Sequence, residues 1–412
     1  MTANTSRLQC LLWDTEAAWG DSVVSMAGAA KLTILEPIDL SGLTHPMLDP
    51  GRVTQYLQET TAGVPGPQAG SFSFKVHLPG HGSTTTGAIT LSDLENLIGW
   101  VLGTTKSAPA SGTTISGAGS TATDIDTVAS GTYALGQLFR LGAKGDSGGD
   151  GQWNVVATHT ATDLVTRVAF AAAPANAAVV YGAANVHTNE AASGSAVTSY
   201  RMQIFSANQQ YILHGCFPMA IAISPLVAGE LITATITIGA SWFEPSADTF
   251  PETTALTTHT PAPIGAGSLN IQVHGTTTRA TYSVRSFGLD IQLGIEPLKG
   301  PDGSNAYQTI VGARRTPTKI TATIVLDAVA ASLTPAWWTA WLTNSAHHIL
   351  YSLSTADGQA MAIYLARCFF RGNRPTQGDV DGLNRTTLVF EAGTNSVTTS
   401  ELTLSALRIG FA

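Results

Sequence analysis

The chain has 412 residues, of which 44% are apolar and only 12% are charged, with a formal net charge of −8 at pH 7. A chain of this length can bury a large core and can divide into two or three domains. The acidic balance argues against a protein that grips nucleic acid, because phosphate binding requires clustered Lys and Arg. The charged fraction is about half the usual one, and so weakly charged a surface favours association with neighbours.

Three cysteines without a short paired spacing favour a reducing compartment and no disulfide framework. The first twenty residues contain Arg7, Asp14 and Glu16 and lack an apolar core with a cleavage site, so we expect no secretion signal. No run approaches the roughly 18 apolar residues that span a bilayer. We therefore expect a protein that is made in a cytoplasm and has no membrane partner.

The early part of the chain predicts strands followed by one short helix. A strand-like run is centred on Asp39, and residues 71–78 alternate strictly between polar and apolar side chains. This alternation predicts a half-buried strand with His77 on its polar face. An apolar segment then follows Ser92, a helix-capping residue, and ends near Gly103.

Periodicity breaks at residues 106–112, and the stretch 106–193, which we call the insert, has its own pattern. Its short β runs lie at residues 133–141, at residues 151–156 around Trp153, and at residues 178–181, between Gly-rich turns. Such runs predict a small β barrel or sandwich. Because Gly and Ser border the insert, we expect deletion of about residues 107–193 to leave assembly possible.

The last third of the chain repeats the landmarks of the first third in the same order. It has an Asp-centred run at Asp290, an alternating strand at residues 320–326, and a helix that starts at Thr334 with Pro335 in its first turn and ends near Asn344. Ordered repetition of this kind predicts one folding unit that is used twice.

The two copies also share a strand with a Cys-Phe pair, at Cys216 and at Cys368. In each copy a Thr-rich strand ends 22 residues after the cysteine, at Ile238 and at Phe390. The distance from helix start to cysteine is 124 residues in the first copy and 34 in the second, which locates the insertion. The predicted fold is therefore mainly β, with two repeated sandwich or barrel domains that each carry one short helix, plus the inserted small β domain. The boundaries are 1–105 and 194–250 for the first domain, 106–193 for the insert, and 251–412 for the second domain.

One motif suggests catalysis. Residues 145–149 read Gly-Asp-Ser-Gly-Gly, which matches the nucleophile motif of chymotrypsin-like proteases. That mechanism also needs a His base and a buried Asp, but the upstream histidines lack the expected sequence context. Gly, Asp and Ser are also the residues that tight turns select. We favour a turn, and we keep a serine hydrolase that uses Ser147 as a remote alternative.

Metal and cofactor sites find little support in the sequence. The pairs His77 with His81 and His347 with His348 have no Cys or carboxylate at ligand spacing, so solvated or interfacial histidines are favoured. The aspartates within residues 146–150 do not follow a calcium-loop pattern, and there is no phosphate-binding loop or dinucleotide fingerprint. We expect no metal and no cofactor.

The remaining candidates are basic residues and thiols. We interpret Cys216 and Cys368 as small buried apolar residues rather than nucleophiles. The arginines are expected to pair with carboxylates across a subunit contact, with nucleic-acid binding as the alternative. Nothing assembles a catalytic site, so we expect no enzymatic activity. The densest basic group comprises Arg314, Arg315, Arg367, Arg371 and Arg374.

Several short features occur in a recognisable order. They are the Glu-Ala-Ala-Trp-Gly sequence of residues 16–20, the Asp-centred strand, the strand-to-helix passage that ends near residue 103, and the Gly-Cys-Phe strand of residues 215–217 followed by Gly229-Glu230 and a Thr-rich strand. In this order the chain resembles the tail tube proteins of long non-contractile-tailed bacteriophages. The resemblance implies a β-sandwich flanked by a helix, with long hairpins of neighbouring subunits joined into a barrel around a DNA channel.

Because such tubes are usually hexameric, the resemblance implies that a duplicated chain forms a homotrimer with a pseudo-hexameric ring, and that rings stack into a tube. The expected function is that of a major tail tube subunit, a structural protein of the virion tail that is assembled in the host cytoplasm. The expected partners are further copies, other tail proteins (tape measure, terminator and tip) and viral DNA in transit, without specific nucleic-acid binding. The alternative is a minor tail, baseplate-hub or decoration protein.

Two paired regions are the expected sources of the channel hairpins. They are Leu32–Gly42 with Glu59–Leu78, and Tyr282–Gly294 with Val311–Leu326, since each contains two strand-like runs joined by a polar loop. A weakly acidic, Thr-rich wall would let DNA slide without binding. We expect the insert on the outer wall of the tube.

Overall fold

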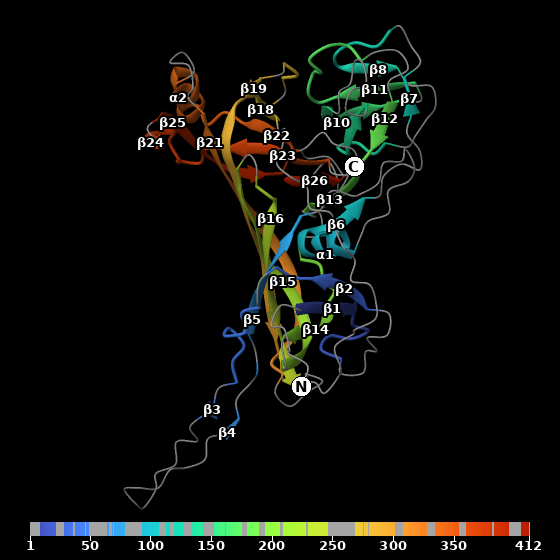
Figure 1. Ribbon diagram of the computed structural model, residues 1–412, viewed down its shortest axis with the longest axis vertical. Helices are drawn as coiled ribbons and strands as arrows, with labels where there is room; N and C mark the ends of the chain where they lie inside the picture. The colour runs from blue at the N-terminus through green and yellow to red at the C-terminus, as the bar shows by residue number, and fades with distance from the viewer. Residues whose placement is uncertain are drawn as a thin grey trace, which may run out of the picture.

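The structure is a computed structural model (Figure 1). It describes residues 9–21, 29–35, 38–45, 47–48, 64–65, 68, 70–78, 93–106, 113–115, 119–126, 133–142, 152–160, 162–174, 179–188, 194–206, 209–227, 230–245, 268–274, 276–278, 280–300, 308–327, 334–353, 360–380, 383–394 and 405–411.

The chain is mainly antiparallel β, as predicted, with two short helices among the described residues, α1 (Asp93–Leu102) and α2 (Thr334–Leu342). We call residues 9–102 with 194–245 the first half and residues 268–411 the second half. Long strands run along the long axis of the molecule and connect the two halves (Figure 1).

The first half consists of two sheets that share one strand. Strand β15 (Gln209–Val227) bends at Gly215, which has a φ of 59°. Before the bend His214 lies opposite Trp242, and after it Phe217 lies opposite Gly239. One sheet contains β2 (Ala30–Thr33), β1 (Gln9–Thr15), β14 (Tyr200–Ser206), the first part of β15 and β17 (Trp242–Pro245); the other contains β5 (Gly70–His77), β16 (Thr233–Ala240) and the second part of β15.

The second half has a corresponding pair of sheets, in which β23 (Met361–Phe369) is the shared strand. Its end, residues 367–369, pairs with the second sheet. One sheet contains β19 (Thr281–Tyr282), β18 (Ser268–Val273), β22 (His347–Leu353), β23 and β26 (Leu407–Phe411); the other contains β20 (Val284–Lys299), β21 (Ile310–Leu326), β25 (Leu383–Gly393) and β24 (Thr376–Val380).

The strand register around the two cysteines is the same in both halves. Cys216 lies opposite Tyr200, and Cys368 lies opposite His347. A register shift follows each pair, after which the partners are Met202 with Leu213 and Ile349 with Leu365. On the other side of the shared strand, Phe217 faces Gly239 and Phe369 faces Glu391, so that 22 residues separate the partners in both halves.

The same register corrects one detail of the predicted repeat, the correspondence of Asp39 with Asp290. Asp290 lies opposite Thr321, which faces Glu391. In the first half the counterpart of Glu391 is Gly239, and Gly239 lies opposite Ser71. Asp39, however, bridges to Ser73, two residues further along β5. The two aspartates are therefore displaced by two residues, and the structural counterpart of Asp290 is Ser41.

The two halves are joined edge to edge within the chain. The second part of β15 pairs antiparallel with β20, from Ala220 opposite Gln292 to Val227 opposite Ser286. This pairing makes one continuous run of strands, β5, β16, β15, β20, β21 and β25. A single apolar core cluster includes residues of both halves, from Leu11 to Phe411.

Each half also has a long hairpin. The pairing of residues 282–294 with residues 311–326 is confirmed, whereas the first pair is matched only in part, since Leu32 belongs to β2, which pairs with β1, and the hairpin extends to residues 47–48, beyond the predicted 32–42. In the second half β20 and β21 pair from Val284 to Lys299. In the first half the bridge from Asp39 to Ser73 continues in register to β3 (Met47–Leu48) and β4 (Val64–Pro65). Strands β3 and β4 project away from the body of the molecule (Figure 1).

The insert is connected through a pair of strands, β6 (Gly103–Lys106) and β13 (Ala184–Thr188), and β13 also pairs with β26 of the second half. The predicted β runs of the insert form part of one sheet. Its order is β7 (Thr113–Thr114), β12 (Val179–Gly182), β9 (Leu138–Leu141), β10 (Gln152–His159), β11 (Asp163–Thr166) and β8 (Asp124–Asp126).

One face of the insert sheet packs on the second half. Trp153 is fully buried in an apolar cluster that includes Ala362, Tyr364 and Ala366 of β23. The guanidinium of Arg408 donates a hydrogen bond to the carbonyl oxygen of Gly136, at 3.0 Å. The insert is therefore packed against the second half and covers apolar surface there, which its Gly/Ser borders did not indicate.

Both helices end where the sequence predicted. Helix α1 stops at Leu102, before Gly103 with a φ of 135°. After α2, Asn344 has a φ of 47°, its N–H donates to Trp341 O, and Ser345 N–H donates to Ala340 O. These two bonds form a Schellman motif.

Candidate functional site

Two of the sequence features noted above, residues 16–20 and residues 215–217, meet at the bend of β15. The carboxylate of Glu16 accepts hydrogen bonds from the N–H groups of Gly20 and Gly215, each at 2.9 Å. The indole N–H of Trp19 donates to Ser241 Oγ at 2.9 Å, and its ring stacks on Phe217 with 6.1 Å between centroids. The Glu16–Gly20 segment thus holds the bend at which β15 passes from one sheet to the other.

Gly215 fits this bend because it lacks a side chain. A Cβ atom here would lie 2.5 Å from Ser241 Oγ and 2.9 Å from the indole nitrogen of Trp19. Burial raises the pKa of Glu16, and its hydrogen bonds, including those from Gly215 and Gly20, offset part of this effect. The chemistry of this cluster is structural, since every polar group in it binds another part of the fold.

The histidines do not form a metal site among the described residues, where no group of three or more potential ligands occurs. The interpretation of His347 and His348 as solvated or interfacial is wrong, because they are 3% and 0% exposed. His347 packs near the rings of Trp337 and Phe370, whereas His348 Nε2 lies 2.9 Å from Gln272 Oε1. Burial lowers the pKa of both, that of His348 to about 3.

Other histidine and serine candidates give less information. His77 is half-buried on β5, opposite the buried Phe74 and Val76 face, and burial lowers its pKa. His81, Ser147 and the aspartates within 146–150 lie outside the described residues.

The basic candidates lie in two places rather than one, on β21 and near the end of β23. Arg314 pairs with Glu296 at 2.7 Å and Arg371 with Glu391 at 3.5 Å, so both arginines have a carboxylate partner within the chain. Arg315 donates to Trp100 O at the end of α1, at 3.2 Å. The guanidinium carbon of Arg367 lies 5.1 Å from the ring centroid of Phe369, and Arg374 is exposed.

The cysteines behave as predicted. Cys10, Cys216 and Cys368 are free and buried. Burial raises the pKa of the Cys216 and Cys368 thiols well above the ordinary value, which keeps them protonated and unreactive.

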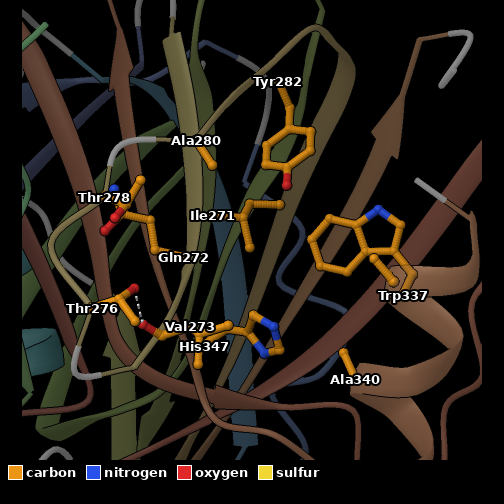
Figure 2. A pocket seen from close by; sticks show the side chains of 11 residues that line it. Ile271, Gln272, Val273, Thr276, Thr278, Ala280, Tyr282, Trp337, Ala340 and His347 are labelled. Atoms are coloured by element: carbon orange, nitrogen blue, oxygen red, sulfur yellow. Dashed lines mark hydrogen bonds between the residues drawn. The ribbon is translucent and has the colours of Figure 1, made fainter. Parts of the chain in front are cut away.

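An apolar pocket of about 280 Å³ lies between α2 and the strands β18, β19 and β22. Figure 2 shows Trp337 across the pocket from Ile271, with Tyr282 above and His347 below. The strand register places Trp13 of the first half where Ile271 stands, since they face Met202 and Ile349 respectively. The smaller side chain of Ile271 accounts for the space, and the described residues that line the pocket include no carboxylate and no thiol.

Unpaired sheet edges are the more informative surfaces. In the described part of the chain β24 pairs with β25 on one side, and no strand pairs along its other side. Asp39 forms a single bridge with Ser73 of β5, and the chain then turns, with Leu43 N–H donating to Leu40 O at 3.0 Å. On α2, the side chains of Trp338 and Leu342 are 39% and 73% exposed. Open edges and exposed apolar side chains favour association with another protein surface.

Comparison with known proteins does not assign the chain to a family. No protein-family model matches the chain, and no curated protein matches it. No described helix has the length and apolar character needed to cross a membrane.

Proposed function

We propose that the chain is a structural protein, the major tail tube subunit of a long non-contractile bacteriophage tail. Three chains form a pseudo-hexameric ring, and rings stack around a DNA-conducting channel. The observation that carries the proposal is the β15–β20 join, because it links two halves of matching strand register into one sheet. Each half, in this proposal, is one tube domain, and the chain supplies two of them.

Closure of a ring gives a physical role to the open edges. An unpaired strand edge is an aggregation hazard in a monomer. Head-to-tail contacts that close after a fixed number of copies leave no free edge. The join of β15 to β20 is one such contact already formed, so further contacts of the same kind would extend the sheet around a ring.

The surface of the joined sheet suits a channel for DNA. Apolar side chains of β16 and β21 enter the core, whereas Thr235, Thr237, Thr321 and Thr323 lie on the opposite, more exposed face. Neutral hydroxyl groups do not hold phosphates as Lys and Arg do. DNA would slide along such a wall, and the protein would have no enzymatic activity.

Electron microscopy of the purified chain, combined with light scattering, tests the proposal. We expect tubes or stacked rings with three chains of 42.7 kDa each per ring. Single rings that do not stack would favour the alternative of a minor tail, baseplate-hub or decoration protein. Six chains per ring, or monomers at all concentrations, would reject the proposed assembly.

A further inference from the structure

The insert and the second half meet at a buried contact, which we call the seam, and two histidines lie in it. Leu350 of β22 packs with Trp153 of the insert. Residues two apart on a strand share a face, so His348 lies on the same side of β22 as Leu350. It stands opposite Gln272 of β18. His274 follows two residues after Gln272, and its ring centroid is 6.4 Å from that of His348.

The geometry around both rings favours the neutral imidazole. His348 Nε2 lies 2.9 Å from the acceptor Oε1 of Gln272, so the neutral ring carries its proton on Nε2. Nδ1 of His348 and Nδ1 of His274 are buried and have no hydrogen-bond partner among the described residues. A proton on either Nδ1 would therefore create a buried donor without an acceptor, which is most costly when the group is charged.

The charged groups that act on the two histidines are basic. Burial is the first cause that lowers the pKa of His274, and Arg167 of the insert and Arg367 of β23 lower it further. For His348 burial is again the first cause, followed by His274, Arg167 and His347, which lies on the opposite face of β22. No carboxylate of the described residues is among the groups that shift the pKa of either histidine.

The other titratable groups of the neighbouring strands supply no negative charge. The ring of Tyr364 on β23 lies 6.1 Å from that of His348, and the guanidinium carbon of Arg408 on β26 lies 5.1 Å from the Tyr364 centroid. Burial raises the pKa of Tyr364 and of Cys368, which keeps both neutral at pH 7. Protonation of the histidines would thus add positive charge where the facing groups are basic or neutral.

We propose that the seam is an acid-sensitive latch between the insert and the second half. Below about pH 6.5, protonation of His274 and His348 favours an open state, in which the insert separates from β22 and β23 and the rings reach water. The insert stays attached, because β6 pairs with β13 and β13 pairs with β26. The open state exposes Leu350, Ala362 and Tyr364. The inference does not depend on the proposed function, since it concerns a contact within one chain.

The size of the effect follows from the two states of His348. Its pKa is about 3 in the closed seam and about 6.5 when the ring is in water. A group whose pKa is lowered in the closed state stabilises that state above pH 6.5 and ceases to do so as the pH falls. Between pH 7 and pH 5 the ratio of open to closed seams should rise about 25-fold from His348 alone. His274 acts in the same direction, because its pKa is also lowered.

Thiol labelling of an Ala362→Cys variant of the full chain tests the latch. Ala362 is fully buried and packs in one cluster with Trp153 of the insert. The labelling rate is measured from pH 7 to pH 5 and divided by the rate of a cysteine peptide at the same pH. We expect the corrected rate at position 362 to rise about 25-fold or more.

The three native cysteines are internal controls for global unfolding. Cys10, Cys216 and Cys368 are buried in clusters outside the seam. Mass spectrometry of labelled peptides identifies which thiols have reacted. We expect these three to stay unlabelled over the pH range in which position 362 becomes reactive.

Three further variants, made together with Ala362→Cys, show which groups cause the effect. Changing both His274→Gln and His348→Gln should abolish the acceleration. His347→Gln is the matched control and should keep it, because His347 packs near Trp337 and Phe370 on the other face of β22. Arg167→Glu should reduce it to a few-fold, since a carboxylate beside the rings stabilises their protonated form in the closed seam.

Each outcome decides for or against the latch. Labelling at position 362 that rises with acid, alone among the four thiols, and only while His274 and His348 are present, would support it. A rate that does not rise, or that rises equally without the two histidines, would overturn it. Labelling of all four thiols together would also overturn it, because acid would then unfold the chain rather than open the seam.

Discussion

Replacement of Trp153 by alanine tests whether the insert and the second half form one cooperative unit. The indole is fully buried among alanines and Tyr364 of β23. Truncation of a buried Trp to Ala costs about 3–5 kcal/mol. Because the surrounding residues belong to both parts, we expect the free energy of unfolding of the insert and of the second half to fall together.

Hydrogen exchange measured by mass spectrometry can follow the parts separately. In the Trp153→Ala variant, we expect lost protection in peptides from β10, β23 and β26, with β5 changed less. Val156→Ala is the matched control, because Val156 is on the same strand but packs with Ile125 and Leu164 inside the insert. It should cost about 2 kcal/mol and affect the insert alone.

Trp153→Phe should be milder than the alanine change, because the buried indole N–H of Trp153 has no hydrogen-bond partner among the described residues. Exchange in β23 and β26 that stays unchanged in Trp153→Ala would refute the reasoning. That result would instead support an insert that is independent of the second half, so that deletion of residues 107–193 leaves the remaining chain folded.

Three further predictions concern the bend, the buried histidine and the ring. Gly215→Ala should lose more stability in urea unfolding than Gly194→Ala: both have positive φ, which costs about 1–2 kcal/mol, but only Gly215 lacks space for a Cβ. Equal losses would contradict the packing argument. Burial lowers the pKa of His348 to about 3. Between pH 6.5 and 3 the unfolded state therefore binds more protons than the folded state. The free energy of unfolding should fall as the pH decreases through this window, by up to about 1.4 kcal/mol per pH unit. His348→Gln should flatten the dependence measured between pH 7 and 5, and an unchanged slope would be evidence against this origin. The mass of assembled rings should be unchanged in Ser147→Ala, and any loss of a hydrolytic activity in that variant would revive the serine hydrolase.

The sequence predicted those features whose signal is local. Alternation at residues 71–78 predicted the buried face of β5, and Asn344 predicted the end of α2. The spacing from Cys216 to Ile238 and from Cys368 to Phe390 predicted the shared register, because a fixed hairpin length keeps the same residues opposite each other.

The remaining features depend on contacts that no local pattern contains. A shift of two residues keeps every side chain of a strand on its own face, so alternation could not distinguish Asp39 from Ser41 as the counterpart of Asp290. All residues of β22 are buried, since the core lies on one face and the insert on the other. The burial of His348 depends on that second cover, which comes from a distant part of the chain.

The β15–β20 join has a consequence for the concentration dependence of assembly. In a ring of three such chains, three of the six contacts between tube domains would be intramolecular and would form during folding. An intramolecular contact has an effective concentration set by its tether rather than by the amount of protein. Each chain would thus arrive with half of the contacts complete, and assembly would require only three encounters between separate molecules.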